Sequence, residues 1–317
     1  MPTKQSEALW DYHRASNRNA ALGQPLPSPR ARDLEDHWGD LTAEPGGVDY
    51  LEVDAGGVPA LWAAPKGSAA DRVILGLHGG GFIGGSMYTH RKMFAHLAKT
   101  AGARALIPNY RRSPEHQHPA PVDDATAAYG WLLDQGIPAG QIALAGDSAG
   151  GGLALTTVLR ARERGLPDPA ALLPISPWVD MTLSGDTIVT NRATDLLFGG
   201  HTPFDLDGLV RMFLGDGDRT DPLASPLHAD LTGFPPMYIQ VGGDEMLLAD
   251  ARGIAERARA AGVEVRLDVF PRQQHTFQMG AGRDPEADDA IGRMAAWVRP
   301  LLGLGAAEPA RMAAAGA

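Results

Sequence analysis

The chain contains no cysteine. Disulfides, thiolate-bound metals and a cysteine nucleophile are therefore excluded, and the composition is compatible with a reducing compartment. Positive charge is also scarce, because 28 Lys and Arg residues face 38 Asp and Glu residues and leave a net charge of −10. A nucleic-acid-binding surface needs an excess of basic residues, so we expect no nucleic-acid partner.

Long hydrophobic runs are missing as well. Residues 1–7 contain no apolar segment of the kind found in secretory signals, and no later run approaches the length of a membrane span. We therefore expect a cytoplasmic protein without stable membrane anchoring. Hydrophobic residues nevertheless make up 44% of the 317 residues, which is enough to fill the core of one α/β enzyme domain with an insertion.

Short apolar runs alternate along the chain with helical patterns. This order is typical of the α/β class, in which helices wrap a mainly parallel sheet. The run at 263–270 alternates apolar and charged residues, which predicts a strand near a sheet edge. We expect helices at 121–134, 250–261 and 286–302, and strands at 73–77, 103–107, 142–145, 171–175, 237–241 and 263–270.

Two regions interrupt this order. Residues 1–45 precede the first expected strand, and residues 182–221 lie between two core strands. Long connections between core strands are usually lids or insertions. We predict that both regions form a small helical cap. The main domain would then comprise residues 46–181 and 222–303, and residues 304–317 would form a flexible tail.

The segment Gly-Asp-Ser-Ala-Gly at residues 146–150 follows an apolar run and precedes a helical one. A serine between two glycines at such a junction is typical of a nucleophile elbow. There a strand turns sharply into a helix, and a Cβ at the flanking positions would clash. One short motif can match by chance, so its context has to decide. The context fits, and Ser148 is the predicted nucleophile.

A serine nucleophile needs a base to take its proton, and in this type of fold the acid and the histidine follow the serine in the sequence. His275 comes directly after the expected strand 263–270. The carboxyl ends of the strands are where open α/β sheets place their active sites. His275 is therefore the predicted general base.

The acid that orients the histidine should also follow a buried strand. Asp244 comes just beyond the run 237–241 and is our prediction. Glu245 and Asp250 are the alternatives. Asp250 is placed to begin or cap the following helix, and Glu245 would have to point the other way round the turn.

The segment His-Gly-Gly-Gly-Phe at residues 78–82 follows the expected strand 73–77. Three successive glycines let the backbone approach a substrate and turn its N–H groups outward. We predict an oxyanion hole formed by the amides of Gly80, Gly81 and Ala149. The lysine and hydroxyl of a phosphate-binding loop are missing from this segment.

Together with residues 110–116, these motifs resemble the hormone-sensitive-lipase-like esterases, the bacterial family IV group of α/β-hydrolases. The resemblance spans about residues 70–300. It implies an eight-stranded, mostly parallel sheet with a helical cap, and a serine hydrolase of short to medium acyl carboxylic esters. No metal or cofactor is implied, and the family hints at a homodimer. The alternatives are an ε-lactone hydrolase, an acetyl-amide deacetylase, or a non-catalytic small-molecule receptor on the same fold.

The sequence departs from the family where Arg112 and Ser113 replace the usual Leu-Ala, and where Thr276 replaces a common Gly. Asp147 and Glu115 match family positions, and we interpret both as buried acids that brace the loops. We expect the acyl pocket to be lined by cap residues beside Phe82. These cap residues are Leu197, Phe198, Met212 and Phe213.

Overall fold

A computed structural model describes residues 4–21, 37–199 and 205–305 of the chain. Its centre is one eight-stranded sheet with the order β1-β2-β4-β3-β5-β6-β7-β8. The pairs β1–β2 and β2–β4 are antiparallel and all others are parallel, which confirms the expected fold. The strands are β1 (Val48–Asp54), β2 (Pro59–Pro65), β3 (Val73–Leu77), β4 (Arg104–Pro108), β5 (Ile142–Asp147), β6 (Ala171–Ile175), β7 (Met237–Gly242) and β8 (Val265–Phe270).

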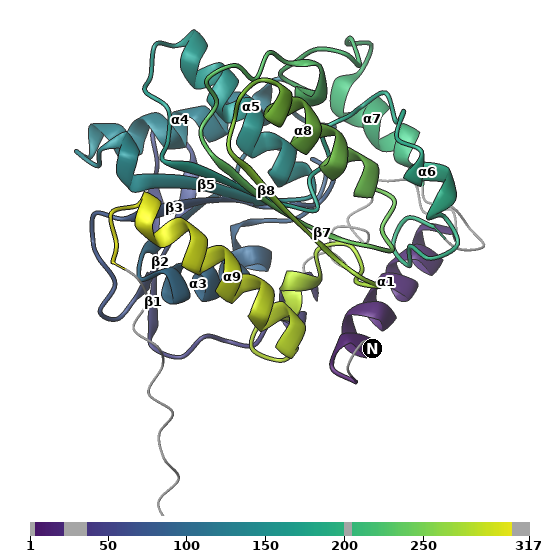
Figure 1. Cartoon of the computed structure of the whole chain (residues 1–317), viewed down its shortest axis with the longest axis horizontal. Helices are drawn as coiled ribbons and strands as arrows, with labels where there is room; N and C mark the ends of the chain where they lie inside the picture. Colours follow the sequence, from purple (N-terminus) through teal and green to yellow (C-terminus); the bar gives the residue numbers. More distant parts are fainter. Residues whose placement is uncertain (1–3, 22–36, 200–204, 306–317) are drawn as a thin grey trace, which may run out of the picture.

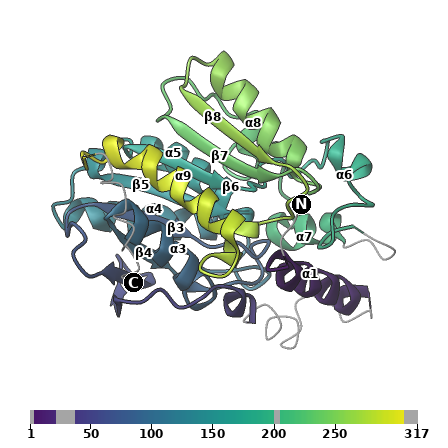
Figure 2. The same cartoon turned by 60° about the horizontal axis from the view of Figure 1, so that its bottom comes forward.

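Helices cover both faces of the sheet (Figure 1), with α3 and α9 on one face and α4, α5 and α8 on the other. Helices α1, α6 and α7 gather at one end of the molecule (Figure 2). The α-helices are α1 (Ser6–Ala21), α3 (Met87–Ala101), α4 (Ala120–Asp134), α5 (Ala149–Glu163), α6 (Thr187–Thr190), α7 (Leu206–Leu214), α8 (Leu248–Ala260) and α9 (Pro285–Leu301).

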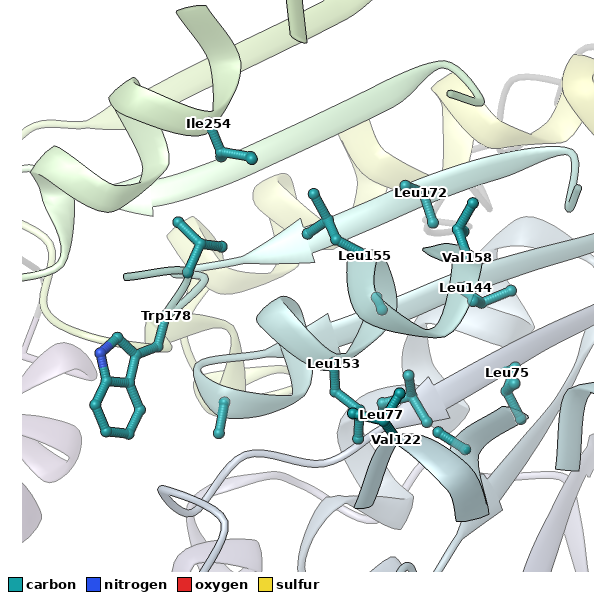
Figure 3. Close-up of a cluster of buried hydrophobic side chains, with 14 of the residues drawn as sticks. Leu75, Leu77, Val122, Leu144, Leu153, Leu155, Val158, Leu172, Trp178 and Ile254 are labelled. Atoms are coloured by element: carbon teal, nitrogen blue, oxygen red, sulfur yellow. The ribbon is translucent and has the colours of Figure 1, made fainter. Parts of the chain in front are cut away.

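Alternating side chains of the central strands fill a core on each side of the sheet. Leu75 and Leu144 pack with α5 on one face, whereas their neighbours Ile74 and Ala143 pack with α3 and α9 on the other. Figure 3 shows the first of these cores, where the leucines of the strands meet Leu153 of α5. Because both faces are buried, the central strands are mostly apolar. Their packing holds the loops at their carboxyl ends in fixed positions.

All six expected strands are present, with ends shifted by at most two residues. Strand β8 pairs only with β7, so its predicted place at a sheet edge is confirmed. The pattern of hydrophobic runs did not predict β1, β2 or α3. Strand β1 has mostly exposed side chains, which explains why it carries no apolar run.

The predicted cap regions contain α1 in the first piece and α6 and α7 in the second. Residues 22–36 and 200–204 of these regions, and residues 306–317 of the predicted tail, lie outside the described residues. The division into cap and main domain therefore stays our interpretation. None of the helices within the described ranges is both long and apolar enough to cross a membrane.

Two helical glycines test how tightly α5 is packed near its start. A Cβ at Gly152 would lie 2.1 Å from the carbonyl oxygen of Trp178, whereas a Cβ at Gly292 of α9 would meet nothing within 4 Å. We expect Gly152→Ala to lower the free energy of unfolding by about 1–3 kcal/mol through overpacking. Gly292→Ala should raise it by up to about 1 kcal/mol, because alanine favours helix. Urea unfolding measures the free energy of unfolding of both variants. Equal values would contradict the close packing of Gly152 against Trp178.

Candidate active site

Ser148 lies at the junction of β5 and α5 with φ 55° and ψ −122°, a conformation that is strained for any residue with a side chain. Its N–H donates to the carbonyl of Ile175 at 2.9 Å. A Cβ at Gly146 would lie 2.1 Å from the carbonyl oxygen of Gly150, and a Cβ at Gly150 would lie 2.0 Å from that of Leu77. Both glycines are therefore sterically required, and the segment forms the sharp turn that its sequence predicts.

Glu245 contacts His275 after β8. The Nδ1 atom of His275 and the Oε2 atom of Glu245 are 2.6 Å apart, and both side chains are fully buried. The other carboxylate oxygen accepts hydrogen bonds from the hydroxyl of Ser176 at 2.8 Å and from the amide of Gly242 at 2.5 Å. The carboxylate is therefore fixed in the orientation that serves the imidazole.

The prediction that Asp244 is the partner of the histidine is wrong. The amide of Asp244 donates to the carbonyl of Gln273 at 3.2 Å, and the amide of Gly243 donates to that of Phe270 at 2.8 Å. These bonds hold the turn against the end of β8, so that residue 245 and not residue 244 points inward. Asp244 is only partly buried; burial raises its pKa and the charge of Arg272 opposes that rise.

Asp250, the other alternative, lies in the first turn of α8, as expected. Its carboxylate accepts the amides of Val179 and Asp180 at 2.9 Å and 3.1 Å. Burial raises the pKa of Asp250 to about 7. Asp250 therefore joins α8 to the segment after β6. Its hydrogen bonds go to that segment and not to His275.

Three carboxylates act on the buried imidazole of His275. Burial alone would lower its pKa, but the charge and hydrogen bond of Glu245, followed by the charges of Asp195 and Asp147, raise the pKa above its ordinary value. Because the carboxylate of Glu245 accepts the proton on Nδ1, the neutral ring carries its lone pair on Nε2. This Nε2 atom is buried and has no hydrogen-bond partner among the described residues.

The loop that carries His275 folds back over the strand ends. The amide of Thr276 donates to the hydroxyl of Ser176 at 3.2 Å, which brings the histidine beside β6, the neighbour of β5 in the sheet. Thr276 has φ 50°, in the left-handed region that favours glycine. This conformation gives a physical reason for the glycine that is common there in the family that the sequence resembles.

The glycine loop after β3 turns sharply at Gly80, where φ is 111° and a Cβ would lie 2.5 Å from the backbone of Gly84. The amides of Gly80, Gly81 and Ala149 donate to no other group in the described part of the chain. Ala149 is also the first residue of α5, where the positive end of the helix dipole lies. These three amides can therefore bind a developing negative charge.

The side chain of Asp147 supports the glycine loop. Its Oδ1 atom accepts the amide of Gly79 at 3.0 Å, and its Oδ2 atom lies 3.2 Å from Nε2 of His90. The side chain is completely buried, so our interpretation of Asp147 as a buried brace is confirmed. The expectation that Glu115 is buried is wrong, because this residue lies exposed in a turn.

The two departures at residues 112 and 113 also support the glycine loop. The amide of Ser113 donates to the carbonyl of Phe82 at 2.8 Å, and the guanidinium of Arg112 bonds the carbonyl of Gly85. Tyr110 stacks on His78 with ring centroids 4.0 Å apart and donates its hydroxyl proton to the carbonyl of His78. The loop is therefore held from several sides before any substrate binds.

Aromatic rings surround the site. Phe82 stacks on Phe213 with centroids 3.9 Å apart, and Phe198 presents its edge to His275 with centroids 5.0 Å apart. The ring centroid of Trp178 lies 6.4 Å from that of Phe82. Sequence reasoning missed Trp178 because no motif marks it. Leu197 and Met212, the other predicted pocket residues, are half-buried and pack against the same core.

Helix α1 adds a further buried imidazole that sequence reasoning also missed. His13 is completely buried, and neither ring nitrogen has a partner within the described residues. Burial, and then repulsion by His275, lower the pKa of His13 to about 3. Asn17, one turn further on, donates to the carbonyls of Leu197 and Gly199 at 3.1 Å and 2.7 Å. Helix α1 is thereby tied to the segment beside the histidine.

Residues 4–21, 37–199 and 205–305 contain no group of three or more His, Asp or Glu side chains arranged to hold a metal ion. A strained serine, an oriented imidazole and free backbone amides lie at the carboxyl edge of the sheet. This arrangement is suited to nucleophilic attack on a carbonyl carbon.

Comparison with known proteins places the chain in a family. The sequence model described as the alpha/beta hydrolase fold matches residues 74–279. An acetyl-hydrolase from Streptomyces hygroscopicus is 40% identical over 290 residues, which cover 91% of this chain and 94% of that protein. An esterase from Acinetobacter venetianus is 34% identical and covers 74% of this chain and 77% of its own.

Solved structures agree with the sequence relatives. The crystal structure of an esterase from the bacterial hormone-sensitive lipase family superposes with a TM-score of 0.88 at 38% identity. The match covers 96% of this chain and all of that chain. The similarity therefore extends through the sheet, the flanking helices and the loops that carry the site.

The two adjacent acids can be separated by titrating His275. Replacing Glu245 by Gln removes the negative charge beside Nδ1, so we expect the pKa of His275 to fall, because the protonated ring loses its main stabilising partner. Asp244→Asn should leave this pKa within about 0.3 units of the wild-type value, as for a charge that does not contact the ring. NMR titration of labelled histidine measures both variants. A larger shift in Asp244→Asn than in Glu245→Gln would contradict the assignment.

Proposed function

Since this chain belongs to the α/β hydrolase family and, within it, to the esterases related to hormone-sensitive lipase, we propose that it hydrolyses carboxylic esters with Ser148, His275 and Glu245 as its catalytic triad. The observation that carries this proposal is the buried pair of Glu245 and His275, whose unpartnered Nε2 atom lies in the loop that folds back toward the serine elbow. Relatives named esterases and an acetyl-hydrolase support the ester hydrolase activity itself.

In the first half of the reaction the hydroxyl of Ser148 attacks the ester carbonyl carbon while Nε2 of His275 accepts its proton. Glu245 holds the ring orientation and stabilises the imidazolium that forms. The amides of Gly80, Gly81 and Ala149 donate to the oxyanion of the tetrahedral intermediate. His275 then gives its proton to the departing alkoxide, and the alcohol leaves an acyl group on the serine oxygen.

In the second half a water molecule replaces the alcohol. His275 takes a proton from the water as it attacks the acyl carbon, and the same three amides again stabilise the oxyanion. The intermediate collapses, Ser148 recovers its proton from His275, and the carboxylic acid is released. The strain at Ser148 keeps the hydroxyl clear of the sheet through both halves.

We propose short to medium acyl groups, acetyl included, as the preferred acids. An acetyl-hydrolase that covers nearly the whole chain supports acceptance of the smallest of them. The sequence-based alternatives, an ε-lactone hydrolase, an acetyl-amide deacetylase and a non-catalytic receptor, find no support in these relatives. The cytoplasmic location and the homodimer remain predictions.

The nucleophile is tested by Ser148→Ala. We expect this variant to lose turnover of p-nitrophenyl butyrate by about 10⁴-fold or more, because it lacks the hydroxyl that attacks the ester carbonyl. A fluorophosphonate probe should label the wild type and fail to label the variant. Circular dichroism provides the control for folding, and turnover or labelling that persists in a folded variant would refute the mechanism.

The acyl range is tested with p-nitrophenyl esters of two to twelve carbons. We expect kcat/KM to be highest for the shorter acids and to fall toward twelve carbons, because the expected pocket residues Phe82 and Phe213 already fill space by stacking on each other. A seven-membered lactone in the same assay measures the alternative activity. A maximum at twelve carbons, or faster lactone than ester turnover, would contradict the proposal.

A further inference from the structure

The turn that carries the proposed catalytic acid is held from outside by a segment of the second cap piece. We call residues 243–246 the acid turn and residues 187–198 the clamp. The side-chain amide of Asn191 donates to the carbonyls of Gly243 and Glu245 at 3.1 Å and 2.9 Å. The hydroxyls of two clamp threonines bond the remaining two carbonyls: Thr194 donates to Asp244 at 3.0 Å and Thr187 donates to Met246 at 2.6 Å.

Asp195 is at the centre of the clamp. Its Oδ2 atom accepts the amide of Met246, the residue after Glu245, at 2.7 Å. Its Oδ1 atom accepts the amides of Leu197 and Phe198, each at 2.8 Å. The side chain is completely buried, so these backbone amides provide the donors that a buried carboxylate needs. One carboxylate thus joins the clamp to the acid turn.

The clamp also holds the loop of His275. The side chain of Gln274 accepts the amide of Leu196 at 2.9 Å and donates to the carbonyl of Thr194 at 3.0 Å. The ring of Phe198, whose amide Asp195 binds, presents its edge to the imidazole. The acid turn and the histidine loop are therefore fixed by the same short segment, although they follow different strands.

We propose that Asp195 is a positioning residue for the Glu245–His275 pair: it fixes the acid turn through the amide of Met246, and it fixes the ring that packs on the imidazole through the amide of Phe198. The inference rests on the proposed function, because it concerns the same triad. It also assigns the clamp a structural role in catalysis, in contrast to a lid that opens and closes over the substrate.

A purely local role for Asp195 is the alternative. An aspartate that accepts the amides two and three residues ahead stabilises a turn by itself, without any effect on a distant group. The bond from the amide of Met246 distinguishes the two roles, because a local turn does not need it. Besides Glu245, the ionisable groups of the described ranges that act on His275 include Asp195 and Asp147, which raise its pKa, and His13, which is coupled to it by repulsion.

The test is Asp195→Asn, which keeps the size of the side chain and removes its charge. We expect kcat for p-nitrophenyl butyrate to fall about 10- to 100-fold, as for a displaced catalytic group, while KM stays within about twofold. The pKa of His275 should fall, so the acid limb of kcat/KM should move to lower pH. Asp205→Asn, an exposed cap of α7 in the same predicted cap piece, is the matched control and should change neither value.

Asn191→Ala separates positioning from charge, since it removes two bonds to the acid turn and no charge. It should lower kcat without moving the acid limb. An Asp195→Asn protein that folds and keeps the wild-type kcat or the wild-type pKa of His275 would overturn the inference. If that variant does not fold, full activity of Asn191→Ala overturns it.

The pKa of His275 is read by NMR and needs no turnover. Failure of the inference is therefore distinguishable from failure of the proposed function. A wild type that neither hydrolyses esters nor reacts with a fluorophosphonate refutes the function, whatever the titration of Asp195→Asn shows. An active wild type whose His275 titrates identically in that variant refutes the inference alone.

Discussion

The hydrogen bond between Glu245 and His275 is the interaction on which the site depends, because it joins two loops that follow different strands. A carboxylate without exposure to water needs donors, and Ser176, Gly242 and the imidazole provide them. The same bond fixes the tautomer of the ring. Without this bond, the lone pair on Nε2 would have no defined direction. The imidazole could then not accept the proton of the strained serine.

The sheet provides the framework for that bond. Strands β3, β5, β6, β7 and β8 end at one edge, and the glycine loop, the elbow, Ser176, the acid turn and the histidine loop follow them in that order. Packing on both faces of these strands leaves little freedom for their ends. Catalytic geometry of this kind needs fixed supports, since small displacements are costly for the rate.

Local sequence motifs predicted much of this arrangement. Gly146 and Gly150 are required by contacts within a few residues of the turn or with the neighbouring strand, so the sequence pattern alone predicts the sharp turn at Ser148. The central strands were recognisable because they are mostly apolar on both faces, and β8 because apolar and charged residues alternate along it. The edge strand β1, with exposed side chains, gave no such signal, and Trp178, His13 and Asp195 belong to no motif.

The sequence by itself determined the class of fold, the elbow serine and the histidine, because steric requirements of the backbone and the order of strands are encoded locally. It did not determine which of two adjacent acids serves the histidine. The order of residues favoured Asp244 over its neighbour Glu245. Only the tertiary structure decided between them, because backbone bonds from the acid turn to residues 270 and 273, together with the clamp, set which side chain turns inward.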